Sequence, residues 1–265
     1  GKYYPLQYAS YMKNKEMAPK EGDFGGNILY QHSVKQPEIL VNFKGYPFSK
    51  DYSDDRGHVY AMEDLMNTKR IGPASKGACI TCKTPYLEKI VKEYGWEYAN
   101  KPLSEMIEFA NKEHGFLSCA NCHDPATMDL RVINPAFMEA MQRRGIDLAK
   151  ASREDMRTYV CAQCHVEYYF QPGTNKVTFP WDKGLKPAEM YAYYSEIPNK
   201  FTGDWEHPDS KVMMLKAQHP DYETFINGAH GKAGVACADC HMPYVRKDGQ
   251  KYSSHWMTSP MRHLE

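Results

Sequence analysis

The chain lacks three features that would assign it to a familiar class. Its 265 residues contain no apolar run close to the ~20 residues that a membrane-spanning helix requires. Its charges balance, with 33 Lys and Arg against 33 Asp and Glu, so no strong field directs it to nucleic acid or to an anionic membrane. No charged-then-apolar leader opens the chain, and we interpret Gly1 as a processed or trimmed start.

An unpaired cysteine is also lacking. All eight cysteines fall in four Cys-x-x-Cys pairs, which are Cys79/Cys82, Cys119/Cys122, Cys161/Cys164 and Cys237/Cys240. Histidine directly follows the last three pairs, as His123, His165 and His241, whereas Lys83 follows the first. The pattern therefore indicates one kind of site present four times, with a variant at the first.

Covalently attached haem explains this pattern best. Two cysteines on a short helical turn can bond the two vinyl groups of one porphyrin, and the next residue then lies beneath the iron as its axial ligand. Zinc ribbons are an alternative, but gaps of 40, 42 and 76 residues between pairs are too long for compact knuckles. A disulfide framework is another, although such close pairs are more typical of redox dithiols. We predict four haem c groups and, because their attachment takes place outside the bacterial cytoplasm, a periplasmic location.

The expected fold is mostly α with long irregular loops, in a single multihaem cytochrome domain over residues 1–265 whose core is built around stacked haems. Residues 1–60 show little periodicity and are expected to form an irregular lead-in. Proline starts and glycine stops predict helices over about 85–95, 102–115, 135–144, 153–160, 187–197 and 211–228, the last interrupted by Pro220. Strand signals are few and short.

Lys83 distinguishes the first motif from the others. A lysine amine binds metal only when neutral, so this ligand must lose a proton that free lysine holds up to a pKa of about 10.4. Such an iron would differ from its neighbours and could keep an open sixth position, which marks a catalytic iron. The alternative is that Lys83 merely follows a degenerate or metal-binding cysteine pair. Eight further histidines could close the other irons: His32, His58, His114, His207, His219, His230, His255 and His263.

From about residue 27 onward the chain resembles the periplasmic, ammonia-forming cytochrome c nitrite reductases. The motif order matches, with the lysine haem first and three histidine haems after it. The segments that carry the resemblance are Gly45–Ser49, Arg56–His58, Asn67–Arg70, Cys79–Lys83, Cys161–Phe170, Leu215–Pro220 and Cys237–Pro243.

The resemblance implies that Arg70, Tyr168 and His219 line the distal pocket over the Lys83 haem. Arg70 would offer nitrite a permanent charge, while His219 and Tyr168 would donate hydrogen bonds or protons. Taken alone, each residue has a simpler interpretation. Arg70 could clamp a haem propionate, Tyr168 could only pack, and His219 could end a helix.

The resemblance also implies further ligands. A calcium ion would be held by the side chains of Glu167 and Gln218 and by the backbone carbonyls of Tyr168 and Lys216, which are oxygen ligands of the kind calcium selects. His58 would be the distal ligand of the haem on His165, and His255 that of the haem on His123. His230 corresponds to the distal ligand of a fifth haem.

The chain departs from the family in one respect. Family members continue into a fifth Cys-x-x-Cys-His motif and long C-terminal helices, whereas this sequence stops at Glu265. Without that region His230 would have no iron, and the haem on His241 would lack its distal histidine. We interpret the chain as the N-terminal part of a longer reductase, and half of a split enzyme is the alternative.

The function implied is six-electron reduction of nitrite to ammonium at the Lys83 haem. The resemblance further implies a small multihaem cytochrome donor linked to membrane quinol, and a homodimer at full length. Two alternatives stay open. One is a pure electron-transfer cytochrome with every iron closed by two ligands, and the other is a related reductase of hydroxylamine, sulfite or tetrathionate.

Overall fold

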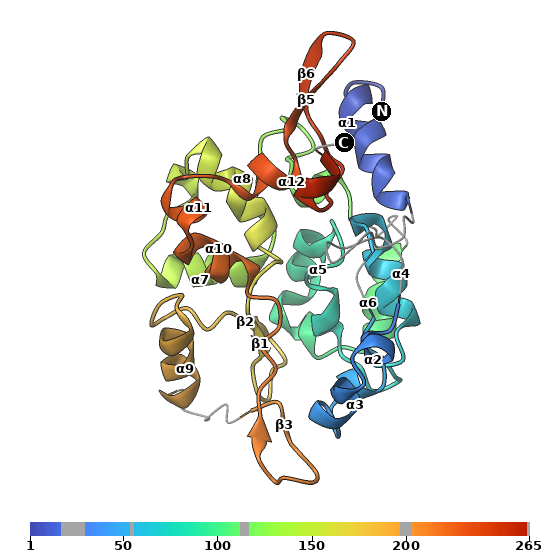
Figure 1. The fold of residues 1–265 in the computed structure, drawn as a ribbon, viewed down its shortest axis with the longest axis vertical. Helices are drawn as coiled ribbons and strands as arrows, with labels where there is room; N and C mark the ends of the chain where they lie inside the picture. The colour runs from blue at the N-terminus through green and yellow to red at the C-terminus, as the bar shows by residue number, and fades with distance from the viewer. Residues whose placement is uncertain (17–29, 54–55, 112–116, 197–202, 264–265) are drawn as a thin grey trace.

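Short helices joined by long loops make up most of the molecule. The computed structural model describes residues 1–16, 30–53, 56–111, 117–196 and 203–263, so His114 lies outside the described residues. Within these ranges the strands form three separate two-stranded antiparallel hairpins (Figure 1). No described helix is long and apolar enough to cross a bilayer. The prediction of a mostly α chain with irregular loops is confirmed.

The five longest helices expected between residues 85 and 197 are present. They are α5 (Leu87–Tyr94), α6 (Leu103–Asn111), α7 (Pro135–Arg143), α8 (Arg153–Ala162) and α9 (Pro187–Glu196). Asn134 caps α7 by accepting a 2.9 Å hydrogen bond from the Ala136 amide. Ser152 and Asp155 form a reciprocal capping box that starts α8. Local end signals explain why these helices could be predicted.

The expected irregular lead-in is partly wrong, because residues 1–67 contain several short helices. None exceeds 8 residues, which is too short to leave a clear periodic pattern in the sequence. They are α1 (Pro5–Met12), η1 (Lys13–Lys15), α2 (His32–Lys35), α3 (Glu38–Asn42), η2 (Pro47–Ser49), η3 (His58–Tyr60) and α4 (Ala61–Asn67).

The helix expected over 211–228 is wrong in its first half. Strand β3 (Trp205–Glu206) pairs with β4 (Met213–Met214), and Lys211 turns the chain between them with a φ of 61°. The helical part begins only after Pro220, as α10 (Asp221–Asn227), followed by α11 (Ala229–Lys232). Proline cannot continue a preceding helix, which accounts for this boundary.

Two large packed apolar clusters and a small one of Tyr169, Tyr193 and Tyr194 form the core of the described residues. One large cluster joins α7 and α8 through Phe137, Phe179 and Trp181, and the other joins α5 and α6 through Leu87 and Met106. The remaining short elements are η5 (Gly95–Ala99), η7 (Leu148–Lys150), η8 (Pro260–His263), β1 (Tyr169–Phe170) with β2 (Val177–Thr178), and β5 (Tyr244–Lys247) with β6 (Gln250–Ser253).

Each cysteine motif begins on a helical turn, as the haem interpretation requires. Cys79 lies in η4 (Gly77–Ile80), Cys119 begins η6 (Cys119–Asn121), Cys161 lies in the last turn of α8, and Cys237 begins α12 (Cys237–His241). At η4 the backbone passes so close to the Tyr98 carbonyl oxygen that a Cβ on Gly77 would lie 2.2 Å from it. Glycine is therefore required there for the first motif to pack.

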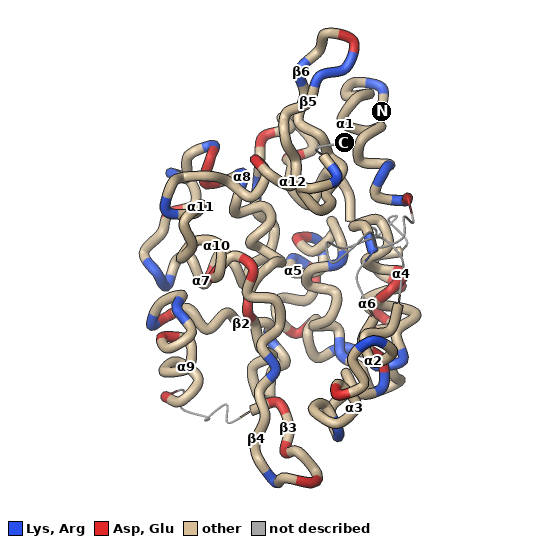
Figure 2. Tube along the Cα trace, in the orientation of Figure 1, with Lys and Arg blue, Asp and Glu red and all other residues tan. Residues whose placement is uncertain are grey.

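The two ends of the described chain meet. Helix α1 lies beside the β5–β6 hairpin (Figure 1). The Asn14 side chain donates a 2.8 Å hydrogen bond to the His255 carbonyl, and the Ser10 hydroxyl accepts a 2.9 Å bond from the His255 amide. Figure 2 shows both signs of charge interspersed along the chain, in keeping with its balanced composition. The N-terminal segment therefore fastens a predicted haem ligand.

Candidate functional site

The four cysteine motifs pack close to one another. The Cys82 side chain lies beside that of Cys164, and the Cys161 side chain lies beside that of Cys237. The third motif therefore touches the first and the fourth. Groups attached to these motifs would be close neighbours, as electron relay between them requires.

The three motif histidines are held in the same way. Nδ1 of His123 donates to the Met128 carbonyl at 2.7 Å, Nδ1 of His241 donates to the Thr258 carbonyl at 3.0 Å, and Nδ1 of His165 donates to the Asp221 carboxylate at 3.0 Å. A ring whose Nδ1 carries the proton presents an unprotonated Nε2 to a metal. This arrangement fits axial ligation of iron by all three histidines.

Imidazole rings face each other at the spacing that a shared iron would need. The ring centroids of His123 and His255 lie 6.1 Å apart, and those of His58 and His165 lie 6.0 Å apart. Metal–nitrogen bonds of about 2 Å on opposite faces of one iron place two such centroids about 6 Å apart. Both pairs match the resemblance, but His219 also lies 6.1 Å from His165. Distance alone does not decide between His58 and His219.

The same rings have accessible surface although protein atoms surround them. Burial lowers the pKa of His58 to about 3 and that of His219 to about 4, with the nearby His165 charge adding to each effect. Nevertheless, 49% of the His165 side chain is exposed. A ring that is surrounded by protein and still has free surface faces an interior space, which fits a large planar group held at this motif.

Three residues expected above the first motif do surround it. Burial raises the pKa of the Tyr168 hydroxyl, and the charges that act on it are those of Cys82, Cys79, Tyr46 and Arg70. The Tyr168 ring lies 5.5 Å from the His219 ring. Lys83 acts electrostatically on His219, and both Lys83 and Arg70 act on Cys79. The structure thus brings Arg70, Tyr168 and His219 together around the motif that carries Lys83.

The residues that precede Arg70 are held by a buried aspartate, Asp51. Asp51 is 5% exposed and accepts hydrogen bonds from the Lys69 amide at 2.7 Å and the Thr68 hydroxyl at 3.1 Å. The Arg70 guanidinium lies 4.1 Å from the centroid of the Phe48 ring, a cation–π contact. Asp51 and Phe48 therefore both hold the loop that carries Arg70.

The residues expected to hold calcium also converge. The Glu167 carboxylate accepts a 2.6 Å hydrogen bond from the Gln218 amide, and the Gln218 side chain lies 3.4 Å from the Lys216 carbonyl oxygen. Burial raises the pKa of Glu167 to about 7, and the nearby Glu223 and Asp204 raise it further. An uncompensated buried carboxylate is unfavourable, so a cation at this place would stabilise it.

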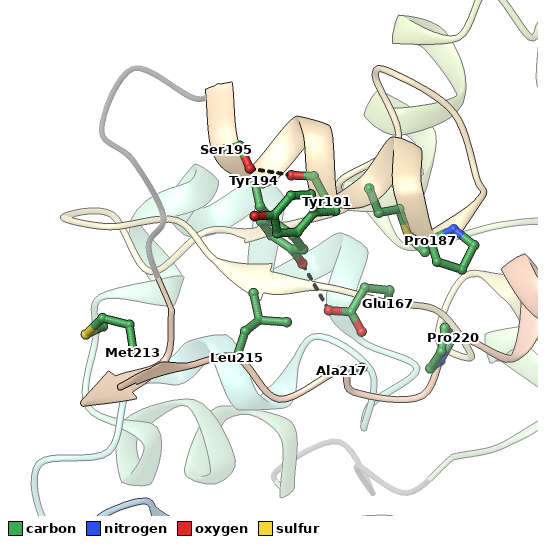
Figure 3. Close-up of a pocket in the computed structure, with 10 residues that line it drawn as sticks. Glu167, Pro187, Tyr191, Tyr194, Ser195, Met213, Leu215, Ala217 and Pro220 are labelled. Atoms are coloured by element: carbon green, nitrogen blue, oxygen red, sulfur yellow. Dashed lines mark hydrogen bonds between the residues drawn. The ribbon is translucent and has the colours of Figure 1, made fainter. Parts of the chain in front are cut away.

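A cavity of about 590 Å³ lies beside Glu167, between α9 and the strand β4. The Tyr194 hydroxyl donates a 3.0 Å hydrogen bond to the Glu167 carboxylate at its wall (Figure 3). Arg70, Tyr168 and His219 do not line this cavity.

The other histidines have different surroundings. His207 uses both ring nitrogens in hydrogen bonds, with Nε2 donating to the Val41 carbonyl and Nδ1 accepting from the amides of Asp209 and Ser210. It is therefore a structural residue. His230 is exposed on α11, and within the described ranges no ring contact joins it to another histidine. It stands apart from the other predicted ligands, as the resemblance implies.

Sequence analysis missed several polar residues of the site. Tyr46, Tyr194, Asp221 and Glu223 all contact predicted site residues or act on them electrostatically. Trp181 and the Glu167 amide both donate to the buried Glu223 carboxylate, at 2.7 and 3.0 Å. The one local signal was the position of Asp221 and Glu223 directly after His219 and Pro220.

Comparison with known proteins agrees with this geometry. The family model described as cytochrome c552 matches residues 1–265. The chain is 42% identical over 292 residues to the cytochrome c nitrite reductase subunit NrfA of Nitratidesulfovibrio vulgaris, covering 99% of this chain and 55% of that protein. It is 40% identical over 272 residues to a cytochrome c-552 of Porphyromonas gingivalis, covering 99% of this chain and 53% of the relative.

A solved structure gives the same result. The catalytic subunit of cytochrome c nitrite reductase from Desulfovibrio desulfuricans, in work on its two calcium sites, superposes with a TM-score of 0.89 at 43% identity. The match covers 98% of this chain and 60% of that one. The chain spans about half the length of the curated relatives that it matches. These matches extend along nearly all of its residues, and the chain belongs to the cytochrome c552 family.

Proposed function

We propose that this chain, as a unit spanning residues 1–265, forms the catalytic part of a nitrite reductase that converts nitrite to ammonium. The observation that carries the proposal is the convergence of Arg70, Tyr168 and His219 on the motif that contains Lys83. The matches to cytochrome c nitrite reductases of other bacteria support it. Conversion of nitrite to ammonium and two waters takes up six electrons and eight protons, so the site must supply both.

Lys83 is the proposed axial ligand of the haem attached to Cys79 and Cys82. That haem, when bound, supplies an iron that can take nitrite and pass electrons to it. The Arg70 guanidinium, oriented by its contact with Phe48, would hold the nitrite anion through charge and fixed N–H donors.

His219 and Tyr168 are the proposed proton donors. Burial favours the neutral His219 ring, which can donate an N–H hydrogen bond and can relay a proton when its other nitrogen takes one from solvent as the N–H proton leaves. The raised pKa of Tyr168 keeps its hydroxyl protonated, so it can donate a hydrogen bond to the bound anion. Their rings are 5.5 Å apart, close enough to act on one small substrate.

The remaining motifs are the proposed relay. Cys119 and Cys122 would attach one haem between His123 and His255, and Cys161 and Cys164 another between His165 and His58. Cys237 and Cys240 would attach the fourth haem over His241, and His230 would serve a fifth beyond this sequence. A periplasmic location, a small multihaem cytochrome donor linked to membrane quinol, and a homodimer of the full-length protein complete the proposal.

Calcium is proposed at Glu167, Gln218 and the carbonyls of Tyr168 and Lys216. The raised pKa of Glu167 supports this site, because a divalent cation would offset the cost of the buried charge. Among the described residues no group of three or more His, Cys, Asp and Glu could hold a metal. The proposed site does not depend on such a group, because most of its ligands are carbonyl and amide oxygens.

The test is nitrite consumption by the full-length, haem-loaded protein with a reduced viologen dye as electron donor. We expect stoichiometric ammonium, and loss of about 10²-fold or more in kcat/KM for nitrite when Arg70 is replaced by Gln. Absence of nitrite consumption by the unaltered protein would refute the proposal. A pure electron-transfer cytochrome, the second candidate, would also show no change in its haem spectrum on addition of cyanide or nitrite.

A further inference from the structure

The acceptor of the Nδ1 proton differs among the three motif histidines. His123 and His241 donate to neutral backbone carbonyls, of Met128 and Thr258. His165 donates instead to a carboxylate, that of Asp221. The motifs are otherwise alike in spacing and in their start on a helical turn, so this carboxylate is what sets the third one apart.

We infer that Asp221 is a positioning residue that tunes the iron bound by His165 through the hydrogen bond to Nδ1. The inference rests on the proposed function, because it takes His165 as an axial ligand. A carboxylate acceptor makes a ligating imidazole more basic than a carbonyl acceptor does. A more basic ligand favours the oxidised iron, so the reduction potential of this haem is lower than it would be with a neutral acceptor.

Two backbone hydrogen bonds hold Asp221 next to the His165 ring. The Tyr222 amide donates to the His165 carbonyl at 3.0 Å, and the Asp221 amide donates to the His219 carbonyl at 2.7 Å. The start of α10 is therefore fastened to the backbone of His165 and to its ring. The segment from His219 to Tyr222 also connects a proposed proton donor with the ligand of the neighbouring relay iron.

The strength of the effect is limited by solvent. The Asp221 side chain is 62% exposed, so water screens part of the interaction. A haem between the two rings would cover the His165 face. We therefore expect a moderate shift that is confined to one haem.

The experiment is a spectroelectrochemical titration of the full-length, haem-loaded Asp221→Asn variant. At a fixed electrode potential the ratio of reduced to oxidised iron at the third motif should rise about threefold to tenfold, where tenfold corresponds to about 59 mV for a one-electron couple. The near-infrared magnetic circular dichroism band that reports axial-ligand basicity should shift for one bis-histidine haem only.

Asp209→Asn is the matched control, because it removes the same charge from a residue that pairs with Lys44 away from the motifs. It should leave all potentials unchanged. Asp221→Glu, which keeps the carboxylate, should restore most of the original potential. No shift in Asp221→Asn, or an equal shift of every haem, would overturn the inference. Failure of the proposed function is recognised separately, by an intact mass that shows no haem on Cys161 and Cys164.

Discussion

The second and third cysteine motifs differ in how many imidazoles their histidines face. Among the described residues the His123 ring faces one imidazole, that of His255, whose Nδ1 is held by the Ser253 carbonyl at 2.9 Å. His165 faces two, His58 and His219, at nearly equal distances. A single opposed ring fits a closed relay iron. The additional ring, that of His219, lies beside the first motif, where it would be available as a proton donor.

A pair of variants tests this difference, with the largest effect expected. His219→Ala should lower kcat for nitrite by about 10²–10⁴-fold, since a positioned proton donor contributes a factor of that order. The number of low-spin bis-histidine haems, counted by electron paramagnetic resonance, should not change. His255→Ala should instead lower that number by one and create a new cyanide-binding iron.

The same measurement distinguishes the two rings beside His165. Loss of one low-spin haem in His219→Ala would show that His219, rather than His58, completes the iron on His165. In that case His58→Ala would leave the count unaltered. Both variants keep the thiols, so an intact mass serves as the control for haem attachment.

Removal of calcium should have the next largest effect, on stability. A cation bound at 100 times its dissociation constant contributes about 2.7 kcal/mol to the free energy of unfolding. We expect a calcium chelator to lower the Tm of the full-length enzyme by about 3 °C. Glu167→Gln should lower the Tm likewise and make it insensitive to the chelator.

Glu206→Gln is the control for that substitution, because Glu206 lies on β3 and forms only a 4.0 Å ion pair with Lys211. This variant should respond to the chelator as the unaltered protein does. A Tm of the unaltered protein that does not depend on calcium would contradict the proposed site.

The parts of the molecule that could be predicted are those with local signals. The Cys-x-x-Cys spacing predicted four helical turns, and the proline starts at Pro135 and Pro187 predicted the first residues of α7 and α9. The main errors in the predicted fold concern very short elements. Helices of 3 to 8 residues near the N-terminus and a hairpin with two residues per strand leave almost no periodic pattern in the sequence.

The supporting contacts of the site could not be predicted from one sequence. Asn14 and His255 are 241 positions apart, and Tyr194 and Glu167 are 27 apart. Nothing in the local pattern around either residue indicates its partner, because such pairs form only when the fold closes. The resemblance supplied the expected ligands but none of the residues that hold them in place.

The smallest effect is expected from replacing Asp51, which holds the loop that carries Arg70. Burial acts to raise the pKa of Asp51, but hydrogen bonds from Lys69, Gln31, Ser53 and Thr68 outweigh it and lower the pKa to about 2. Because the folded-state pKa is lower than the unfolded value near 3.8, the stabilisation is complete above pH 4 and is lost as the pH falls towards 2.

Asp51→Asn should therefore reduce the free energy of unfolding at pH 7 by about 2 kcal/mol, measured by urea denaturation. The difference between the variant and the unaltered protein should shrink between pH 4 and pH 2. KM for nitrite should rise more than kcat falls, because a loosened Lys69–Arg70 loop weakens anion binding and leaves the proton donors in place. Equal stability of the two proteins at pH 7 would mean that these hydrogen bonds do not support the loop that carries Arg70.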